Sequence, residues 1–376
     1  MARIFIFAFD LGEASQLRRI RSLRALGHDL RIAGFRRGNQ TAQAELEAGY
    51  VELGRVGNNR LARRALTLIA ALWRFIRQGG GLRGVDVIIA RNFDLLLLAW
   101  AVRVTCRGRS VRLVYECLDI HGIFTRRDRI GAAMRWAERR LLRRIDLLII
   151  SSPGFLSGYF EPIQAYDGPT ALIENKMWFD GAVIPRPTQA RPVRSDRPLT
   201  LGWVGSIRCE PSLALLTATA RHLGDRLQIR IHGNVHRHVL TDFDRRIAEL
   251  GNVTYAGEYR YPEDLAAIYG GCDLVWSQDL WQRGANSDWL LPNRIYEASW
   301  FGCPSVAVAD TETGRRVVKD GLGFVIERAD TAALAHLLNS LDRSHIREVS
   351  QAVLDMDNRV FRLTSDDVAQ AFATVL

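Results

Sequence analysis

Several features that would mark this sequence of 376 residues as a special class of protein are missing from it. Its longest apolar runs, such as 94–102 and 147–150, fall far short of the roughly 20 residues that a membrane-spanning helix needs. The five cysteines (106, 117, 209, 272 and 303) are scattered and form neither a disulfide framework nor a metal knuckle. The first residues, MARIFIFAFD, show no cleavage signature. We therefore expect a cytoplasmic protein with reduced cysteines in its core.

Hydrophobic residues make up 48% of the chain and charged residues 24%, which is typical of a folded globular protein. The length suits two domains of roughly 180 residues each. Short β-branched runs alternate with helical stretches, a pattern that predicts parallel sheets covered by helices on both faces. A polar segment with prolines 185, 187, 192 and 198 interrupts the alternation and is typical of a linker.

The alternation can be read as two successive doubly wound α/β domains. The predicted strands of the first are 3–8, 29–33, 85–90, 112–116, 146–151 and 170–173, and its helices 15–26, 61–77, 95–105 and 130–144. The predicted strands of the second are 199–204, 228–232, 253–255, 273–277, 304–307 and 323–326, and its helices 211–223, 242–250, 262–269, 292–301 and 332–341. We set the boundaries at 1–184, a linker 185–198, 199–360, and a C-terminal helix 361–376 that crosses back. Ligands of such sheets lie beyond the carboxyl ends of the strands, which places the expected site in a cleft between the domains.

Charge is divided unequally between the two halves. Residues 1–194 carry 32 Lys and Arg against 17 Asp and Glu, a net +15, whereas the remainder carries a net −5. Because net charge reports on partners more than on the fold, we expect an anionic surface to meet the first half.

The segment 291–306, LPNRIYEASWFGCPSV, combines a helix start at Pro292 with a Gly-Pro exit. Asn293 and Glu297 lie one turn apart on one face, with Arg294 beside them. A carboxylate can accept hydrogen bonds from two vicinal ribose hydroxyls, and an arginine at a helix start suits a diphosphate. An amphipathic surface helix without a ligand is the alternative interpretation.

Two loops after strands of the second half add to this candidate site. Gly205 and Ser206 follow the first strand and precede a helix, and small residues there let a backbone approach a phosphate. Arg208 is the nearest cation, and Gly233 follows the next strand and is expected to line the same cleft. The three histidines 232, 236 and 238 are too loosely spaced for a metal, and the Asp-x-Asp pairs at 242–244 and 355–357 sit in helix-like stretches. We expect no metal and no cofactor.

Taken together, these motifs resemble those of the family 4-like GT-B glycosyltransferases. The resemblance rests on Pro292, Asn293, Arg294, Tyr296, Glu297, Gly302, Pro304 and Val306. It implies a GT-B fold of two Rossmann-like domains facing across a cleft, with Glu297 on the donor ribose and Arg208 on the donor diphosphate. Many relatives carry a second glutamate eight residues before the first, and this chain has Trp289 there.

The first half contributes two further candidates. The loop 9–13 and the arginine-rich helix after it resemble the opening of the same family, which implies that Asp10, Gly12 and Glu13 border the acceptor. Asp119 and His121 follow a strand end together with Glu116. A histidine and a carboxylate there can orient a sugar hydroxyl or take a proton, and relatives place a similar element against the donor sugar. We predict Asp119 and His121 as catalytic, with a structural histidine as the alternative.

The segment 58–78 places arginines around apolar and aromatic residues at helical spacing. Arg60, Arg63, Arg64 and Trp73 fit a helix that lies on an anionic membrane surface, and an ordinary packed helix is the alternative. Nucleic acid is disfavoured, because no known nucleic-acid module is present.

The sequence thus predicts an enzyme that moves sugar from a nucleotide-sugar to a lipid-linked or membrane-proximal glycan acceptor. We expect retention of configuration, no metal, and a position on the cytoplasmic face of the plasma membrane in exopolysaccharide or envelope glycan assembly. A catalytically inactive nucleotide-binding partner and a non-hydrolysing sugar-nucleotide epimerase remain as alternatives.

Overall fold

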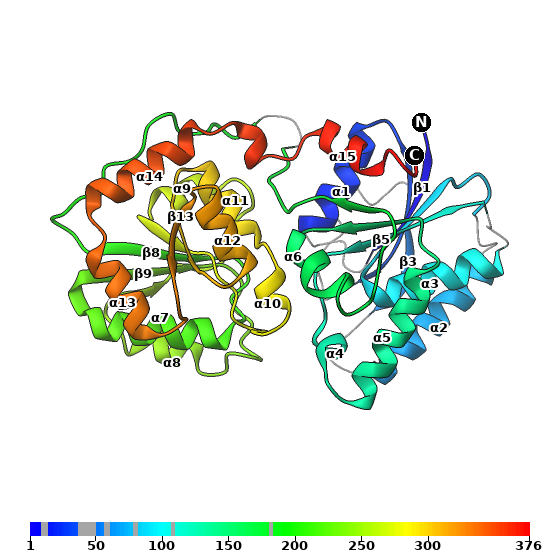
Figure 1. Ribbon diagram of the computed structural model, residues 1–376, viewed down its shortest axis with the longest axis horizontal. Helices are drawn as coiled ribbons and strands as arrows, with labels where there is room; N and C mark the ends of the chain where they lie inside the picture. The colour runs from blue at the N-terminus through cyan, green and yellow to red at the C-terminus, as the bar shows by residue number, and fades with distance from the viewer. Residues whose placement is uncertain (9–13, 37–49, 56–60, 78–81, 107–109, 180–182) are drawn as a thin grey trace. The chain divides into compact units, whose positions relative to one another are not determined.

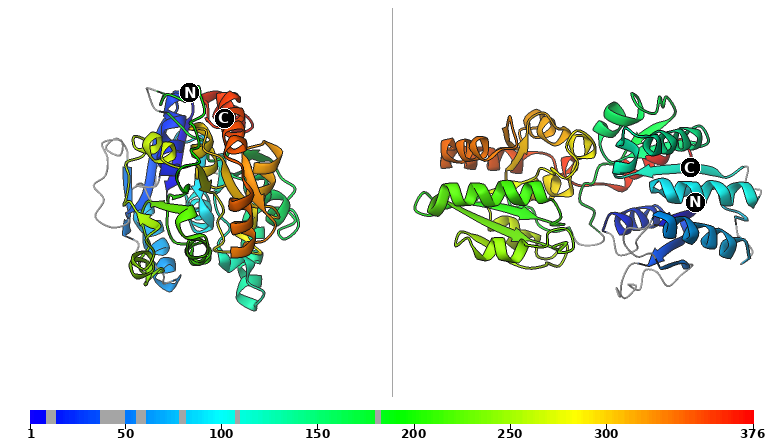
Figure 2. Two further views of the ribbon diagram at one scale, coloured as in Figure 1. Left: turned by 90° about the vertical axis from the view of Figure 1, so that its left-hand side faces the viewer. Right: turned by 90° about the horizontal axis from the view of Figure 1, so that it is seen from below.

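A computed structural model describes residues 1–8, 14–36, 50–55, 61–77, 82–106, 110–179 and 183–376. The chain divides into two compact units, which we call unit 1 (Met1–Glu174 with Leu363–Leu376) and unit 2 (Asn175–Arg362). The ends of the chain both belong to unit 1 and lie close together there (Figures 1 and 2).

Unit 1 is built on a sheet of seven parallel strands in the order β3-β2-β1-β4-β5-β6-β7. The strands are β1 (Arg3–Ala8), β2 (Asp29–Arg36), β3 (Tyr50–Arg55), β4 (Val87–Arg91), β5 (Arg112–Cys117), β6 (Leu147–Ile150) and β7 (Thr170–Leu172). The helices are α1 (Ala14–Ala25), α2 (Leu61–Arg77), α3 (Asn92–Thr105), α4 (Gly122–Thr125), α5 (Arg129–Leu142), α6 (Pro153–Phe155), a π-helix (Leu156–Phe160) and α15 (Ser365–Phe372). Helix α1 leads from β1 to β2, in one direction along the sheet, whereas α2 and α3 lead to β4 and β5, in the other direction. Because such crossovers are right-handed, α1 covers one face of the sheet and α2 and α3 cover the other. Helix α3 packs against both α2 and α5.

Unit 2 repeats the plan with six parallel strands in the order β10-β9-β8-β11-β12-β13. The strands are β8 (Leu199–Val204), β9 (Leu227–His232), β10 (Val253–Tyr255), β11 (Leu274–Trp276), β12 (Ser305–Val308) and β13 (Gly323–Ile326). The helices are α7 (Glu210–Leu223), α8 (Phe243–Ala248), α9 (Leu265–Gly270), α10 (Asn286–Trp289), α11 (Asn293–Trp300), α12 (Glu312–Lys319), α13 (Thr331–Ser340) and α14 (Arg343–Asp355). The 3₁₀ turns are Gly224–Arg226 and Asn358–Val360.

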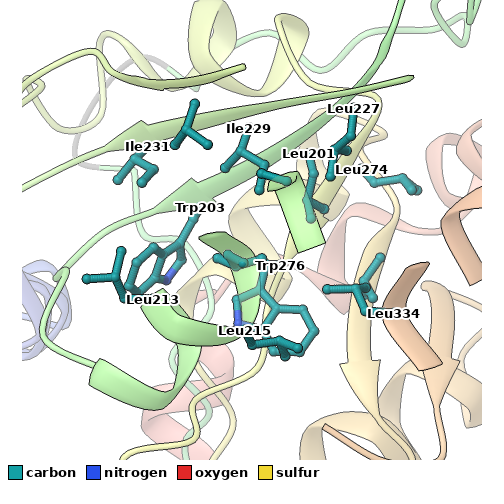
Figure 3. Packing of buried hydrophobic residues seen from close by; sticks show 14 of the residues in the cluster. Leu201, Trp203, Leu213, Leu215, Leu227, Ile229, Ile231, Leu274, Trp276 and Leu334 are labelled. Atoms are coloured by element: carbon teal, nitrogen blue, oxygen red, sulfur yellow. The ribbon is translucent and has the colours of Figure 1, made fainter. Parts of the chain in front are cut away.

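Two apolar clusters hold unit 2 together, one on each face of its sheet. Helices α7, α8 and α13 enclose one of them, in which Trp203 and Trp276 lie against Leu213 and Leu334 (Figure 3). Helices α9, α11, α12 and α14 cover the other face (Figure 1). Burial of these side chains fixes the strand ends, and with them the loops that follow, in one place.

A buried carboxyl links α5 to the core of unit 1. Glu138 accepts hydrogen bonds from the Tyr115 hydroxyl (3.3 Å), from Gln164 Nε2 (2.6 Å) and from the Tyr159 hydroxyl. Burial raises the pKa of Glu138 to about 7, although these three donors act in the opposite direction.

The domain boundaries differ from those expected from the sequence. Unit 1 ends at Glu174 instead of residue 184, and the expected linker 185–198 belongs to unit 2. Prolines keep this segment out of helices and sheets, but its arginines bind it to unit 2, since Arg191 and Arg197 both donate to the buried carboxylate of Asp273. The C-terminal segment returns to unit 1, where α15 packs on α1. The predictions missed β3, α12 and α14, and also the short helices α4, α6 and α10 and the π-helix.

Candidate functional site

The carboxyl ends of β8 and β11 form the switch point of the sheet in unit 2. These two strands are neighbours, and the chain leaves them towards opposite sides of the sheet. A crevice forms beyond the strands at such a point, and ligands of doubly wound sheets bind there. The predicted residues Gly205, Ser206, Arg208 and Gly233 all follow β8 or β9, so the structure brings them to this edge.

The loops after β8 and β9 are in direct backbone contact. Gly205 N donates to His232 O (2.9 Å) and Ile207 N donates to Asn234 O (2.9 Å). Gly205 and Gly233 have φ values of +114° and +132°, which side chains strongly disfavour. A Cβ at Gly233 would lie 1.8 Å from the carbonyl oxygen of Gly205. Only glycine at position 233 therefore allows the two loops to approach this closely.

Arg208 lies one residue before Cys209, the N-cap of α7, and is exposed. The second residue of α7 is Pro211, which has no N–H, so the charge of Arg208 is the main feature of this helix start that suits an anion. Within the described residues, no carboxylate pairs with Arg208. Ser206 Oγ lies 2.9 Å from Nε2 of His236. A free guanidinium beside a helix start is suited to a diphosphate.

Helix α11 carries the other predicted donor residues. Arg294 Nη1 lies 3.4 Å from the carbonyl oxygen of Trp276 at the end of β11, which places the first turn of α11 at the switch point. Glu297 is 5% exposed and accepts a hydrogen bond from the Tyr269 hydroxyl (3.0 Å). Asn293 begins the helix and is half-buried. Helix α11 therefore carries the Arg294 guanidinium and the Glu297 carboxylate at the carboxyl end of the sheet.

Two tyrosines of this edge were not predicted from the sequence. Tyr269 of α9 holds the Glu297 carboxylate, and burial together with that carboxylate raises the pKa of Tyr269 well above its usual value. Burial and the Glu297 carboxylate also raise the pKa of Tyr259, while Arg294 acts in the opposite direction. Both tyrosines are far from Glu297 in sequence. The one signal in the sequence is that Tyr259 belongs to the loop 256–262, which follows β10 at the carboxyl end of the sheet.

Helix α10, between β11 and α11, ends at Trp289, the position at which the family pattern has a second glutamate. The carboxylate of the neighbouring Asp288 already accepts two hydrogen bonds, from Arg283 Nη1 (2.5 Å) and from Gly284 N (2.8 Å). Arg283 also binds Asp310 (2.8 Å), which follows β12. The segment between β11 and α11 is therefore held in place by the ion pairs of Arg283 with Asp288 and Asp310.

Unit 1 has a buried ionic cluster at the carboxyl ends of β4 and β5. Glu116 accepts from Arg19 of α1 (2.8 Å) and lies 3.1 Å from Nε of Arg91. Burial would raise the pKa of Glu116, but the two guanidinium groups outweigh it and lower the pKa. Gln16 accepts from Arg91 (3.0 Å), and Arg19 stacks on the ring of Phe372 in α15. Glu116 is thus held as an anion and joins α1, β4 and β5.

The predicted catalytic residues Asp119 and His121 follow the same strand but are exposed. His121 is the N-cap of α4, and its Nδ1 accepts a hydrogen bond from Ile123 N (3.1 Å). A ring nitrogen that accepts is unprotonated, so the neutral imidazole carries its proton on Nε2. His121 therefore presents a hydrogen-bond donor to its surroundings.

Some predicted residues cannot be placed. Asp10, Gly12, Glu13 and Arg60 lie outside the described residues. Arg63 and Arg64 lie in α2, but the structure describes no side chain for either of them. In the described part of α2, Leu66, Ile69, Trp73 and Ile76 are all exposed and form one stripe at helical spacing.

The Asp-x-Asp pair at 242–244 serves in surface ion pairs. Asp242 binds Arg246 (2.7 Å) and Asp244 binds Arg237 (2.8 Å). Among the residues that the structure describes, no three His, Cys, Asp or Glu side chains gather as they would around a metal ion. The absence of a metal from the reaction stays a prediction.

Comparisons with known proteins agree with this picture. Residues 13–176 match the family model described as a glycosyl transferase 4-like domain. The succinoglycan biosynthesis protein ExoL of Rhizobium meliloti (strain 1021) is 38% identical over 344 residues, covering 91% of this chain and 85% of ExoL. The fold and these likenesses define an enzyme of the GT-B glycosyltransferase class. The chain belongs to the glycosyl transferase 4-like family.

Solved structures share the fold over the whole chain. Sucrose-phosphate synthase from Thermosynechococcus elongatus superposes with a TM-score of 0.75 at 15% identity, covering 98% of this chain and 97% of that one. Anabaena HepE in complex with UDP-glucose gives 0.66 at 14% identity, with 98% of each chain covered. The predicted fold class of two Rossmann-like domains is thereby confirmed.

Proposed function

We propose that this glycosyltransferase moves a sugar from a nucleotide-sugar to a lipid-linked or membrane-proximal glycan acceptor. The observation that supports the proposal is the carboxyl end of β8 and β11, where Arg294 of α11 contacts the end of β11 and the two closely packed glycine loops follow β8 and β9. Solved relatives of the same fold include HepE, which was crystallised with UDP and with UDP-glucose.

Each donor residue has a role that its chemistry supports. The Glu297 carboxylate, oriented by Tyr269, accepts from the ribose hydroxyls. Gly205 and Gly233 leave room for the diphosphate against the backbone, and Arg208 and Arg294 offset its charge. Negative charge grows on the leaving diphosphate during transfer, so fixed cations there lower the barrier. This is why we propose a reaction that needs no metal.

We also propose that the reaction retains the configuration of the sugar. An inverting reaction needs a general base near the acceptor. Glu116 is buried, and the guanidinium groups of Arg19 and Arg91 lower its pKa, which makes it a weak base. His121 offers a donor at Nε2 while its Nδ1 is engaged as the cap of α4. In this proposal His121 donates to a sugar hydroxyl, and Asp119 positions the substrate beside it.

Exposed helices of unit 1 support a membrane-proximal acceptor. The apolar stripe of α2 includes Trp73, which is 62% exposed, and exposed arginines 74 and 77 flank it. Helix α5, which lies in the same layer, exposes Trp136 beneath the guanidinium of Arg140 (5.2 Å to the ring centre). Aromatic and basic side chains on one surface suit an anionic lipid interface. In the described part of the chain, no helix has the length and hydropathy to cross a bilayer.

The name of the related ExoL indicates the pathway in which we place the reaction. ExoL is a succinoglycan biosynthesis protein. We propose that the present enzyme likewise extends an exopolysaccharide or another envelope glycan, at the cytoplasmic face of the plasma membrane.

A transfer assay tests the proposal. Purified protein is first screened by thermal shift against UDP-, GDP- and dTDP-sugars, because a ligand of the folded state raises its melting temperature. The donor that binds is then incubated, radiolabelled, with lipid extract from the source cells. We expect label in the lipid fraction with the wild type and with Glu348→Ala, an exposed control on α14, but almost none with Glu297→Ala. Equal transfer by Glu297→Ala would contradict the site, and binding without turnover would favour a nucleotide-binding partner.

A further inference from the structure

A pocket of about 460 Å³ opens in unit 2 at the amino ends of β8 and β9. The residues before β8, the 3₁₀ turn before β9 and the junction of α13 and α14 line it. Since β8 and β9 run parallel over six residues each, the pocket lies about 20 Å from the loops at their carboxyl ends. It is therefore separate from the candidate donor site, and the volume is in the range of small-molecule sites.

Three arginines line this pocket, namely Arg197, Arg226 and Arg343. Arg197 donates to the buried Asp273 carboxylate, which Arg191 also occupies. Arg226 binds the side-chain oxygen of Asn339 (3.1 Å).

Arg343 differs from the other two arginines. It begins α14, and its Nη1 atom is buried without a hydrogen-bond partner in the described structure. A buried donor left unpaired is costly, so the Arg343 side chain would gain the most of the three from an added acceptor.

Positive charge exceeds negative charge around the pocket. The three lining arginines stand against two lining carboxylates, those of Asp196 and Asp225. The surplus of one positive charge favours an anionic ligand.

Apolar side chains also line the pocket. Five leucines contribute to it, at positions 199, 223, 227, 338 and 341, beside the polar Ser195 and Asn339. A bare inorganic anion would fill only part of the volume of about 460 Å³, whereas a ligand with an apolar group would also reach the leucines.

We propose that the pocket binds a small molecule in which a phosphate or carboxylate is attached to an apolar group. The oxyanion accepts from the Arg343 guanidinium and lies near Arg226, and the apolar group rests on the leucines. The site is independent of the nucleotide-sugar, because it occupies the opposite edge of the sheet.

Calorimetric titration of the full-length protein with phenyl phosphate tests this proposal. We expect binding that saturated nucleoside diphosphate does not displace, and weaker binding of both inorganic phosphate and benzyl alcohol. Arg343→Gln should raise the dissociation constant about tenfold or more, through loss of a charged hydrogen bond. The matched control is Arg347→Gln, an exposed arginine one turn further along α14 that does not line the pocket.

A second variant guards against misfolding. Arg226 is exposed, so Arg226→Gln keeps the core of unit 2 intact and should also weaken phenyl phosphate binding. The proposal is overturned if the wild type gives no binding, if the nucleoside diphosphate competes, or if both pocket variants bind like Arg347→Gln. Because the nucleotide-sugar site is measured separately, failure here leaves the proposed function unaffected.

Discussion

Replacing Gly233 by alanine should disturb the donor site strongly, although it adds only one methyl group. The new Cβ would lie 1.8 Å from Gly205 O, and real Cβ contacts are essentially never below 3.0 Å, so one loop must move by about 1.2 Å. A displacement of this size at a binding site typically costs about 100-fold in activity. The φ of +132° adds strain of about 1–3 kcal/mol in the folded state. Isothermal titration with the donor nucleotide and urea unfolding measure the two effects.

Two other glycines separate the clash from the backbone strain. Gly205 and Gly224 also have positive φ, but a Cβ at either position meets nothing within 4 Å. Gly224→Ala, at the end of α7, should lower stability and leave nucleotide affinity unchanged, and Gly205→Ala should lie between the two. If Gly233→Ala binds nucleotide as well as Gly224→Ala does, the close contact of the two loops does not shape the site.

Three further outcomes follow from the structure. Tyr269→Phe removes the donor to Glu297 and should weaken nucleotide binding by about threefold to tenfold, measured by titration, with no change in fold by circular dichroism. Because the pKa of Glu138 is raised to about 7, unit 1 should lose about 3 kcal/mol of stability as pH rises from 4.5 to 7, and hydrogen exchange should show no such loss in Glu138→Gln. Trp73→Ser should reduce binding to anionic vesicles severalfold, whereas Trp281→Ser, which changes an exposed tryptophan of unit 2, should not.

Much of the fold could be predicted from local patterns. The buried strand β6 is a continuous apolar run, β8 is interrupted only by Thr200 and Gly202, and α11 begins after a proline and is followed by a glycine. Local patterns did not predict features that depend on contacts between residues far apart in the chain. Prolines in 185–198 predicted a linker, but Arg191 and Arg197 reach Asp273 more than 70 residues away and bind the segment to unit 2.

The candidate site shows the same limit. Glu297 and Arg294 lie within one helical turn, so their closeness could be predicted from the sequence. Glu116 was grouped with Asp119 and His121 because they are neighbours, yet its partner Arg19 is 97 residues away. Burial separates Glu116 from the two exposed residues, and burial of a charge depends on the whole sheet.

The central claim is that Arg208 and Arg294 bind the diphosphate of the donor at the switch point of unit 2. The most direct measurement is the affinity for the nucleoside diphosphate and for the monophosphate of the same base, in the wild type and in Arg208→Ala/Arg294→Ala. We predict that the wild type binds the diphosphate at least tenfold more tightly and that the double variant loses most of this difference. An unchanged difference between the two nucleotides in the double variant would contradict the account.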